Sequence, residues 1–154
     1  MKAVLSPLQV EFYGIDNVSV RSNESYEPEG DRVSEAKPTL EIHYTEASEE
    51  DSFFVVMQLA ITEEEEAGVP EETIPYWIEL EVVGQFSVSS VQDTEKLEWM
   101  QMFNAPAILY GFARAEVAHL TEKNTYGSYM LPTVDFISMA NQYAVAEPTE
   151  NGEE

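Results

Sequence analysis

Alternating apolar and polar residues predict four β-strands in the first part of the chain. The expected strands are 10–20, 39–47, 53–62 and 76–90. Short acidic stretches at 48–51 and 63–72 separate the last three strands, so we expect these strands to pair antiparallel as hairpins. The pattern therefore predicts an antiparallel meander of four strands.

The parity of the apolar positions predicts which face each strand buries. In the first strand, one face is expected to hold Val10, Phe12, Gly14, Val18 and Val20. In the fourth strand, Tyr76, Ile78, Leu80 and Val82 alternate with Trp77, Glu79, Glu81 and Val83. Gly84 interrupts this strand and is expected to mark a bulge or a bend. One face of the sheet should thus be covered by a helix, while the other carries Glu and His.

Helical spacing replaces alternation after the fourth strand. Asp93 or Thr94 can cap a first, short helix. A longer helix is expected over 106–123, with Pro106 in its first turn, where proline is tolerated. Its apolar stripe consists of Ile108, Leu109, Phe112, Ala113, Val117 and Leu120. Four strands followed by a short and a long helix predict an α+β fold in one domain, 1–145, with an acidic, disordered tail at 146–154.

The residues between the first two strands, 21–38, show no periodicity and predict a long, exposed crossover loop. Tyr26 and Val33 are its sizeable apolar side chains. A loop of this length in a compact domain is often functional, so the crossover is a candidate functional segment.

The charge of the chain limits its partners. It carries 30 acidic and 7 basic residues, for a net charge of −23. Such a chain repels nucleic acid and anionic membranes, and it attracts a basic partner. The alternative is that the charge only keeps an otherwise sticky protein soluble. Cysteine is absent, and we expect neither a signal peptide nor a membrane-spanning segment, which together favour a cytoplasmic protein.

No catalytic motif stands out in the sequence, so no enzyme activity is expected. There is no phosphate-binding loop and no nucleophile elbow. His43 and His119 have no second histidine or cysteine at ligand spacing, and the acidic run 63–66 lacks the alternating ligands of a calcium loop. We therefore expect no metal and no cofactor.

The stretch 104–136 carries a more specific pattern. A proline precedes an apolar helix that contains Ala-Arg, and a Leu-Pro-x-Val-Asp-Phe segment follows. This pattern resembles the SecB family of export chaperones. The matching residues are Pro106, Ile108, Leu109, Tyr110, Phe112, Ala113, Arg114, Thr125, Leu131, Val134 and Phe136. The family has proline where Gly111 stands and usually asparagine where Asp135 stands, and its order of four strands and then two helices is the order predicted above.

The resemblance implies a function. SecB-like proteins hold non-native polypeptides in apolar grooves without ATP, pass them to the SecA motor, and form homotetramers built as dimers of dimers. It implies a client groove near Tyr26, Phe86, Trp99, Tyr126, Tyr129 and Met130. It also implies a docking role for Trp77 and Glu79 on the outer face of the sheet.

Two departures from the family pattern bear on that role. The crossover loop 21–38 lacks the tryptophan that the family carries there. Asn17 and Arg21 stand at the two acidic docking positions of the first strand, and a shift by one residue would bring Asp16 into play. Two hypotheses follow: a holdase chaperone for non-native chains, or a SecB-like adaptor for one folded, basic partner without client holding.

The long helix also predicts self-association. Its apolar residues extend further around the cylinder than one small sheet requires, and small residues allow a second helix to approach closely. We expect equivalent helices to pack together in a homo-oligomer, with the first strand pairing across a dimer. The expected interface residues are Ile108, Gly111, Phe112, Ala115 and Ala118.

Overall fold

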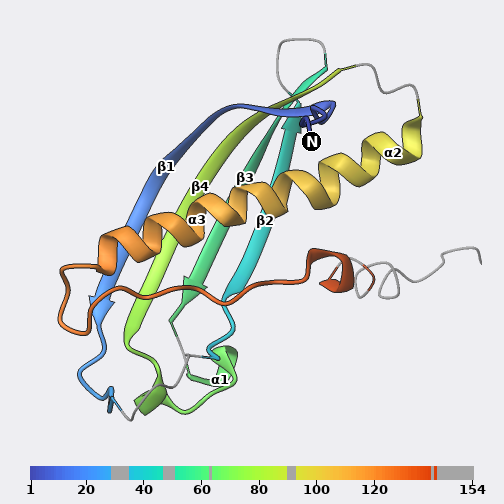
Figure 1. Ribbon diagram of the computed structural model, residues 1–154. Helices are drawn as coiled ribbons and strands as arrows, with labels where there is room; N and C mark the ends of the chain where they lie inside the picture. The colour runs from blue at the N-terminus through green and yellow to red at the C-terminus, as the bar shows by residue number, and fades with distance from the viewer. Residues whose placement is uncertain (29–34, 47–50, 63, 90–92, 140, 142–154) are drawn as a thin grey trace, which may run out of the picture.

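Four antiparallel strands and one long helix account for most of the structured part of the chain (Figure 1). The computed structural model describes residues 1–28, 35–46, 51–62, 64–89, 93–139 and 141. The strands are β1 (Leu8–Ser22), β2 (Thr39–Glu46), β3 (Ser52–Ile61) and β4 (Tyr76–Val88). This arrangement confirms the predicted α+β class.

The order of the strands in the sheet is β1-β4-β3-β2. The meander therefore comprises β2, β3 and β4, while the crossover loop carries the chain from β1 to the far edge of the sheet, so that β1 lies beside β4. All three strand pairs are antiparallel, as expected. Between β3 and β4 the chain forms a short helix α1 (Glu64–Ala67) and a 3₁₀ turn η1 (Glu71–Thr73), where sequence analysis predicted an acidic turn.

Two bulges in β1 correct the faces predicted for this strand. The pairing with β4 shifts between Val10 and Phe12, and again between Ile15 and Asn17. Each shift reverses the face that the following residues occupy. Phe12 and Gly14 therefore lie on the outer face, away from the helix, while Tyr13 faces inward, where its ring stacks on Phe112 at 4.1 Å.

Gly84 does not mark a bulge. It pairs in regular register with Tyr13 on β1 and Val55 on β3. A Cβ atom at this position would lie 2.6 Å from Cε2 of Phe86 and 3.0 Å from Cδ1 of Leu109. Glycine is therefore needed here because an aromatic ring and the helix press onto the strand.

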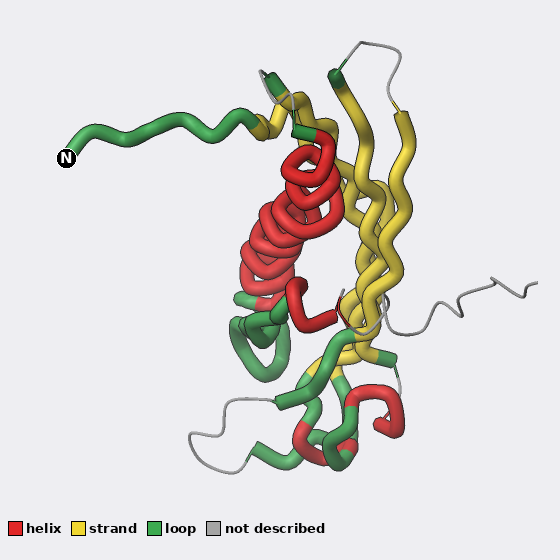
Figure 2. The backbone as a smooth tube through the Cα atoms, turned by 90° about the vertical axis from the view of Figure 1, so that its right-hand side faces the viewer, coloured by secondary structure: helices red, strands yellow, loops and turns green. Residues whose placement is uncertain are grey.

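The two expected helices form one continuous helix, which lies across one face of the sheet (Figure 2). It consists of α2 (Thr94–Trp99), a π-helical segment η2 (Met100–Asn104) and α3 (Ala105–Thr121). Asp93 is the N-cap, and its carboxylate accepts hydrogen bonds from the amides of Glu95 and Lys96. Pro106 thus lies inside a longer helix, and the π-helical turn directly before it is where the helix adapts to it.

The core lies between this helix and the inner face of the sheet. Its helical side chains include Leu109, Ala113 and Val117, which are fully buried. Beyond α3, residues 127–135 run back across the sheet beside the helix, and Leu131 and Phe136 complete the core (Figure 1). The tail expected at 146–154 lies outside the described residues.

Candidate polypeptide-binding surfaces

A cluster of four tyrosines lies at the end of the sheet that is nearest to the C-terminal end of α3. This tyrosine cluster consists of Tyr26, Tyr76, Tyr126 and Tyr129. Tyr26 and Tyr126 meet edge to face at 4.7 Å. The Tyr76 hydroxyl donates to the Gly127 carbonyl at 2.8 Å and accepts from the Tyr126 amide at 2.9 Å. Burial raises the pKa of the Tyr76 hydroxyl, so it stays protonated as this bridge requires.

The tyrosine cluster also fixes the start of the crossover loop. Asn23 is buried, and its amide group donates to the carbonyls of Ile74 and Glu71 at 2.8 and 3.0 Å. The Tyr126 hydroxyl donates to the Asn23 carbonyl at 2.9 Å. Because Asn23 is held from both sides, Tyr26 is positioned against Tyr126 with part of each ring accessible.

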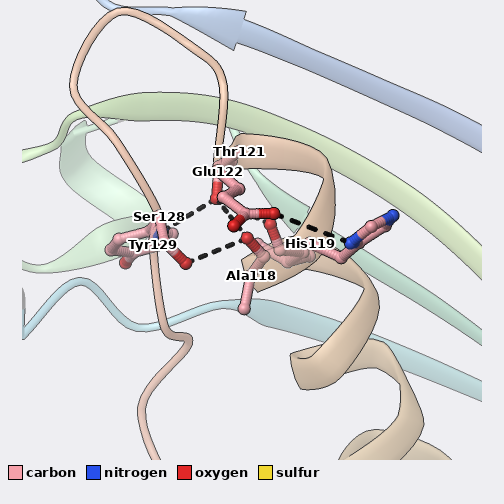
Figure 3. Close-up of polar contacts among 7 residues, drawn as sticks. Ala118, His119, Thr121, Glu122, Ser128 and Tyr129 are labelled. Atoms are coloured by element: carbon pink, nitrogen blue, oxygen red, sulfur yellow. Dashed lines mark hydrogen bonds and ion pairs between the residues drawn. The ribbon is translucent and has the colours of Figure 1, made fainter.

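Hydrogen bonds tie the end of α3 to the loop that follows (Figure 3). The buried Thr121 hydroxyl donates to the Val117 carbonyl and accepts from the Tyr129 amide, both at 2.7 Å. Ser128 donates to the Ala118 carbonyl at 2.9 Å. Tyr129 is only 6% exposed, so it belongs to the core, although its place in a loop led us to expect exposure.

A second apolar surface lies at the opposite end of the helix. The ring centroids of Trp99 and Phe103 are 4.2 Å apart. The side chains of Trp99 and Met102 are 44% and 53% exposed. Tyr44, near the end of β2, lies beside them because its hydroxyl donates to the Met102 carbonyl at 3.2 Å. We call this surface the kink patch, after the π-helical segment: Tyr44, Trp99, Met102 and Phe103.

The Met102 carbonyl, which accepts from Tyr44, lies four residues before Pro106. In an α-helix, the N–H of residue 106 would bond to the carbonyl of Met102, and proline has no N–H. The Tyr44 hydroxyl supplies a donor to that carbonyl. Burial raises the pKa of Tyr44, which keeps this donor protonated. The kink patch is thus linked to edge strand β2 at one defined point.

The six residues expected to line one groove do not lie together. The rise from Trp99 to Thr121 along the helix is about 33 Å, so Trp99 is far from Tyr26 and Tyr126. Phe86 is fully buried and stacks on Phe53 at 5.6 Å. Met130 is exposed on the returning segment. The structure therefore brings Tyr26, Tyr126 and Tyr129 together and separates them from Trp99.

The motif of 104–136 has a clear structural purpose. The Tyr110 hydroxyl donates to the Pro132 carbonyl at 2.6 Å, and Nε of Arg114 donates to the Leu131 carbonyl at 2.9 Å. The rings of Tyr110 and Phe136 meet edge to face at 5.8 Å. These contacts hold the returning segment beside α3, so the motif residues build the scaffold between the two apolar surfaces.

Trp77 and Glu79 lie on the outer face of β4, as expected. The register places Arg21 opposite Trp77 and Ser19 opposite Glu79. These four residues, with Thr62 and Ile78, line a cavity of about 270 Å³. Asp16 lies at the second bulge and has no partner in β4, while Asn17 pairs with Glu81. The outer face thus combines an indole, a carboxylate and a guanidinium around one hollow.

The expected oligomer interface divides between two faces of α3. Ile108, Gly111 and Ala115 are exposed, and the space beside Gly111 is open. Phe112 is partly buried against Tyr13 and so is engaged within the chain. Ala118 is partly buried, and its carbonyl accepts from Ser128. The outward side of α3 is therefore a stripe of small side chains with Ile108 near one end.

Sequence reasoning missed two exposed aromatic residues. Phe12 is 58% exposed on the outer face, and Tyr44 belongs to the kink patch. The adjacent aromatics Phe12 and Tyr13 could have indicated an exposed ring. Neighbouring residues in a strand point to opposite faces, so one of the two rings must lie on the outer face. The role of Tyr44 follows from a contact with a residue 58 positions away, which no local pattern predicts.

In the part of the chain that the structure describes, no helix is long and apolar enough to cross a membrane. Nor do three or more acidic or histidine side chains gather there as a possible metal site.

A sheet covered on one face by a long helix, with exposed aromatic side chains near both ends of that helix, defines an α+β protein with two accessible apolar surfaces. The chain belongs to the SecB family: the model of preprotein translocase subunit SecB matches residues 9–147. A protein-export protein SecB of Hyphomonas neptunium is 29% identical over 83 residues, which cover 53% of this chain and 49% of that relative. The match thus spans about half of the relative's length.

Two solved structures share the fold. The SecB-like chaperone Rv1957 of Mycobacterium tuberculosis, in complex with a ChAD peptide from the HigA1 antitoxin, is 13% identical, with a TM-score of 0.50 over 83% of this chain and 88% of that one. A Streptococcus agalactiae protein of unknown function is also 13% identical, with a TM-score of 0.52 over 81% and 96% of the two chains. Family membership supports a chaperone or export-related role.

Proposed function

We propose that this protein is an ATP-independent holdase that binds non-native polypeptides on exposed apolar side chains. The observation that carries the proposal is the kink patch, where two aromatic residues and a methionine are accessible at an edge of the fold. Methionine and aromatic side chains adapt to varied partners, because they are large and make few directional contacts. The peptide in the complex of the SecB-like chaperone Rv1957 adds support for polypeptide binding.

The kink patch and the tyrosine cluster suit an extended client. They lie about 33 Å apart along the helix, a span that roughly ten extended residues cover. We propose that a client chain contacts both surfaces and passes over Met130 on the returning segment. Acidic residues at the helix surface, such as Glu95 and Glu98, favour clients with basic residues between their apolar ones.

Suppression of aggregation tests the proposal. A denatured model protein should aggregate less when this chain is present at stoichiometric amounts. The double variant Trp99→Ala/Met102→Ala should suppress less, because it removes apolar contact area without touching the core. The matched control is Phe12→Ala, which removes an exposed aromatic from the outer face. Equal loss in variant and control, or no suppression by the parent chain, contradicts the proposal.

A second candidate function is an adaptor for one folded, basic partner. It is favoured by the net charge of −23, by the missing tryptophan in the crossover loop, and by the cavity beside Trp77 and Glu79 on the outer face. A SecA-like motor is one such partner. Calorimetry with a purified SecA-type protein tests this role: Trp77→Ala and Glu79→Lys should each weaken binding, while Trp99→Ala should not. One stoichiometric partner in a pull-down favours the adaptor, and many non-native clients favour the holdase.

We further propose a homotetramer, a dimer of dimers. Support comes from the exposed stripe of α3 and from β1, which pairs only on its β4 side within the described chain. Self-association would cover both features. Raising the salt concentration should tighten assembly, because it screens repulsion between chains of charge −23 while apolar burial persists. Light scattering at low and high salt tests this, and a 17.4 kDa monomer under both conditions contradicts it.

A further inference from the structure

The first six residues form an arm that leaves the body of the protein. They have no secondary structure, and Val4 and Leu5 are 95% and 84% exposed. Two adjacent apolar side chains held almost completely in water are unfavourable, because burying each one would contribute about 1.5–3 kcal/mol. Among the described residues, neither Val4 nor Leu5 is covered by another part of its own chain.

The base of this arm is fixed, so its direction is part of the fold. The Pro7 carbonyl accepts from the Ser89 amide at 3.0 Å, at the end of β4. The Ser6 hydroxyl accepts from the Leu8 amide at 3.2 Å, and the Gln9 side chain donates to the Ser6 carbonyl at 2.6 Å. Proline fixes its own φ angle and holds the residue before it in an extended conformation.

From this base the arm extends on the helix side of the sheet and passes beyond the helix (Figure 2). Six extended residues reach about 20 Å, which is roughly twice the diameter of a helix. The arm thus crosses the layer in which the exposed stripe of α3 lies and enters the space beyond it. A second copy packed on that stripe would lie within its reach.

The charges also suit a second copy. The first ten residues contain Lys2 and no acidic residue, whereas the chain as a whole carries −23. The helix layer exposes Glu95, Glu98 and Glu122 beside the basic Lys96 and Lys123, so its charges nearly balance. An arm with Lys2 and no acidic residue can therefore lie on this layer without the repulsion expected between other surfaces of two chains of charge −23.

We infer that residues 1–6 of one chain dock on the helix layer of a second copy, with Val4 and Leu5 as the apolar anchors. The inference rests on the self-association proposed above and adds to it a specific contact. In this arrangement, the stripe of α3 forms a flat contact between the two copies. The arm adds a second contact, because it starts at the edge of the sheet and reaches the helix layer of the partner copy.

Light scattering over a dilution series tests the arm. Val4→Asp/Leu5→Asp should raise the dissociation constant of the assembly about tenfold or more, since each lost apolar contact is of the order of one factor of ten. The control is Thr39→Asp/Thr45→Asp, which adds two negative charges at exposed outer-face positions of β2, outside the proposed contacts of α3 and β1. Circular dichroism should show both variants folded, because none of the four side chains is in the core.

The absence of cysteine allows a direct second test. Leu5→Cys gives a chain with one thiol, which a benzophenone maleimide can label. In a mixture of labelled and isotope-marked chains, irradiation should join two different chains, with cross-links on residues of 94–121. Cross-links confined to one chain would overturn the inference. An oligomeric parent with an unaffected Val4→Asp/Leu5→Asp variant overturns the arm alone, whereas a monomeric parent overturns self-association and the arm together.

Discussion

The two ends of the long helix are held in different ways. At its C-terminal end, buried groups are connected: Thr121 bonds to the Tyr129 amide, and Tyr76 bridges Tyr126 and Gly127. At its N-terminal end, α2 has no buried residue, and Leu97 is only partly buried against the core. The hydrogen bonds described at this end are exposed: the Asp93 cap and the bond from Tyr44 to Met102. Apolar side chains therefore stabilise the fold at the C-terminal end of the helix, whereas at the N-terminal end several of them remain accessible to solvent.

The largest effect on stability is expected from Thr121→Val, at the C-terminal end. Valine keeps the shape of the side chain but removes the buried hydroxyl and both of its 2.7 Å hydrogen bonds. We expect the free energy of unfolding to fall by about 1–3 kcal/mol, measured by urea denaturation. Thr121→Ser keeps the hydroxyl, so its free energy of unfolding should fall by less. A larger loss in Thr121→Ser than in Thr121→Val would show that the methyl group, and not the hydrogen bonds, holds this end.

A smaller effect is expected from Tyr44→Phe, at the N-terminal end. The change removes the donor to the Met102 carbonyl and should cost about 0.5–1.5 kcal/mol. In the background Pro106→Ala the cost should shrink, because alanine restores a helical N–H for that carbonyl. A double-mutant cycle by chemical denaturation measures this coupling, and a coupling of zero would separate Tyr44 from the proline.

Asp93→Ala should have a smaller effect again, confined to the start of α2. Losing the N-cap should cost about 0.5–1 kcal/mol at this exposed site. Hydrogen exchange should speed up at the amides of Glu95 and Lys96 and remain unchanged in α3. Asp93→Asn retains a capping oxygen and serves as the control. Faster exchange throughout α3 would contradict the view that the two ends are independent.

The smallest effect concerns Asp135, which ends the returning segment between the two surfaces. Hydrogen bonds from Ser138 lower its pKa below the usual 3.8. Because the folded pKa is the lower one, its stabilising contribution is present above pH 3.8 and is lost as the pH falls through the folded pKa. An NMR titration of the carboxyl carbon should give a midpoint below 3.8 in the parent chain and a higher one in Ser138→Ala.

The strands were predictable because their alternation is regular. Along β4, the buried residues Tyr76, Ile78, Leu80 and Val82 share the parity that the sequence indicated. The faces of β1 were predicted wrongly at Phe12 and Tyr13, because the pattern assumed an uninterrupted period of two. The bulges arise from pairing with β4, and nothing in β1 alone specifies where they fall.

The helix and the site were predicted less completely. Pro106 indicated a helix start, which is the common case, yet tertiary packing carries the helix through it by way of the π-helical turn. Tyr129 was expected to be exposed from its place in a loop, and it is buried because Thr121 binds its amide. The candidate site combines surfaces from β2, the helix and the crossover loop, and the proximity of such distant segments is not encoded in local spacing.

The bulges of β1 have one more consequence, for the protein's own solubility. An edge strand presents unpaired backbone groups on which other copies can stack into fibrils. Glu11 and Asp16, the residues at the two bulges, have no opposite residue in the β4 register and are both acidic and exposed, although the Glu11 carboxylate accepts a hydrogen bond from the Ser87 hydroxyl of β4. In-register stacking would bring each carboxylate to about 4.8 Å from its equivalent and would require flattening two kinks. The edge therefore discourages fibril growth, so apolar side chains can remain exposed elsewhere without the sheet itself becoming a template for aggregation.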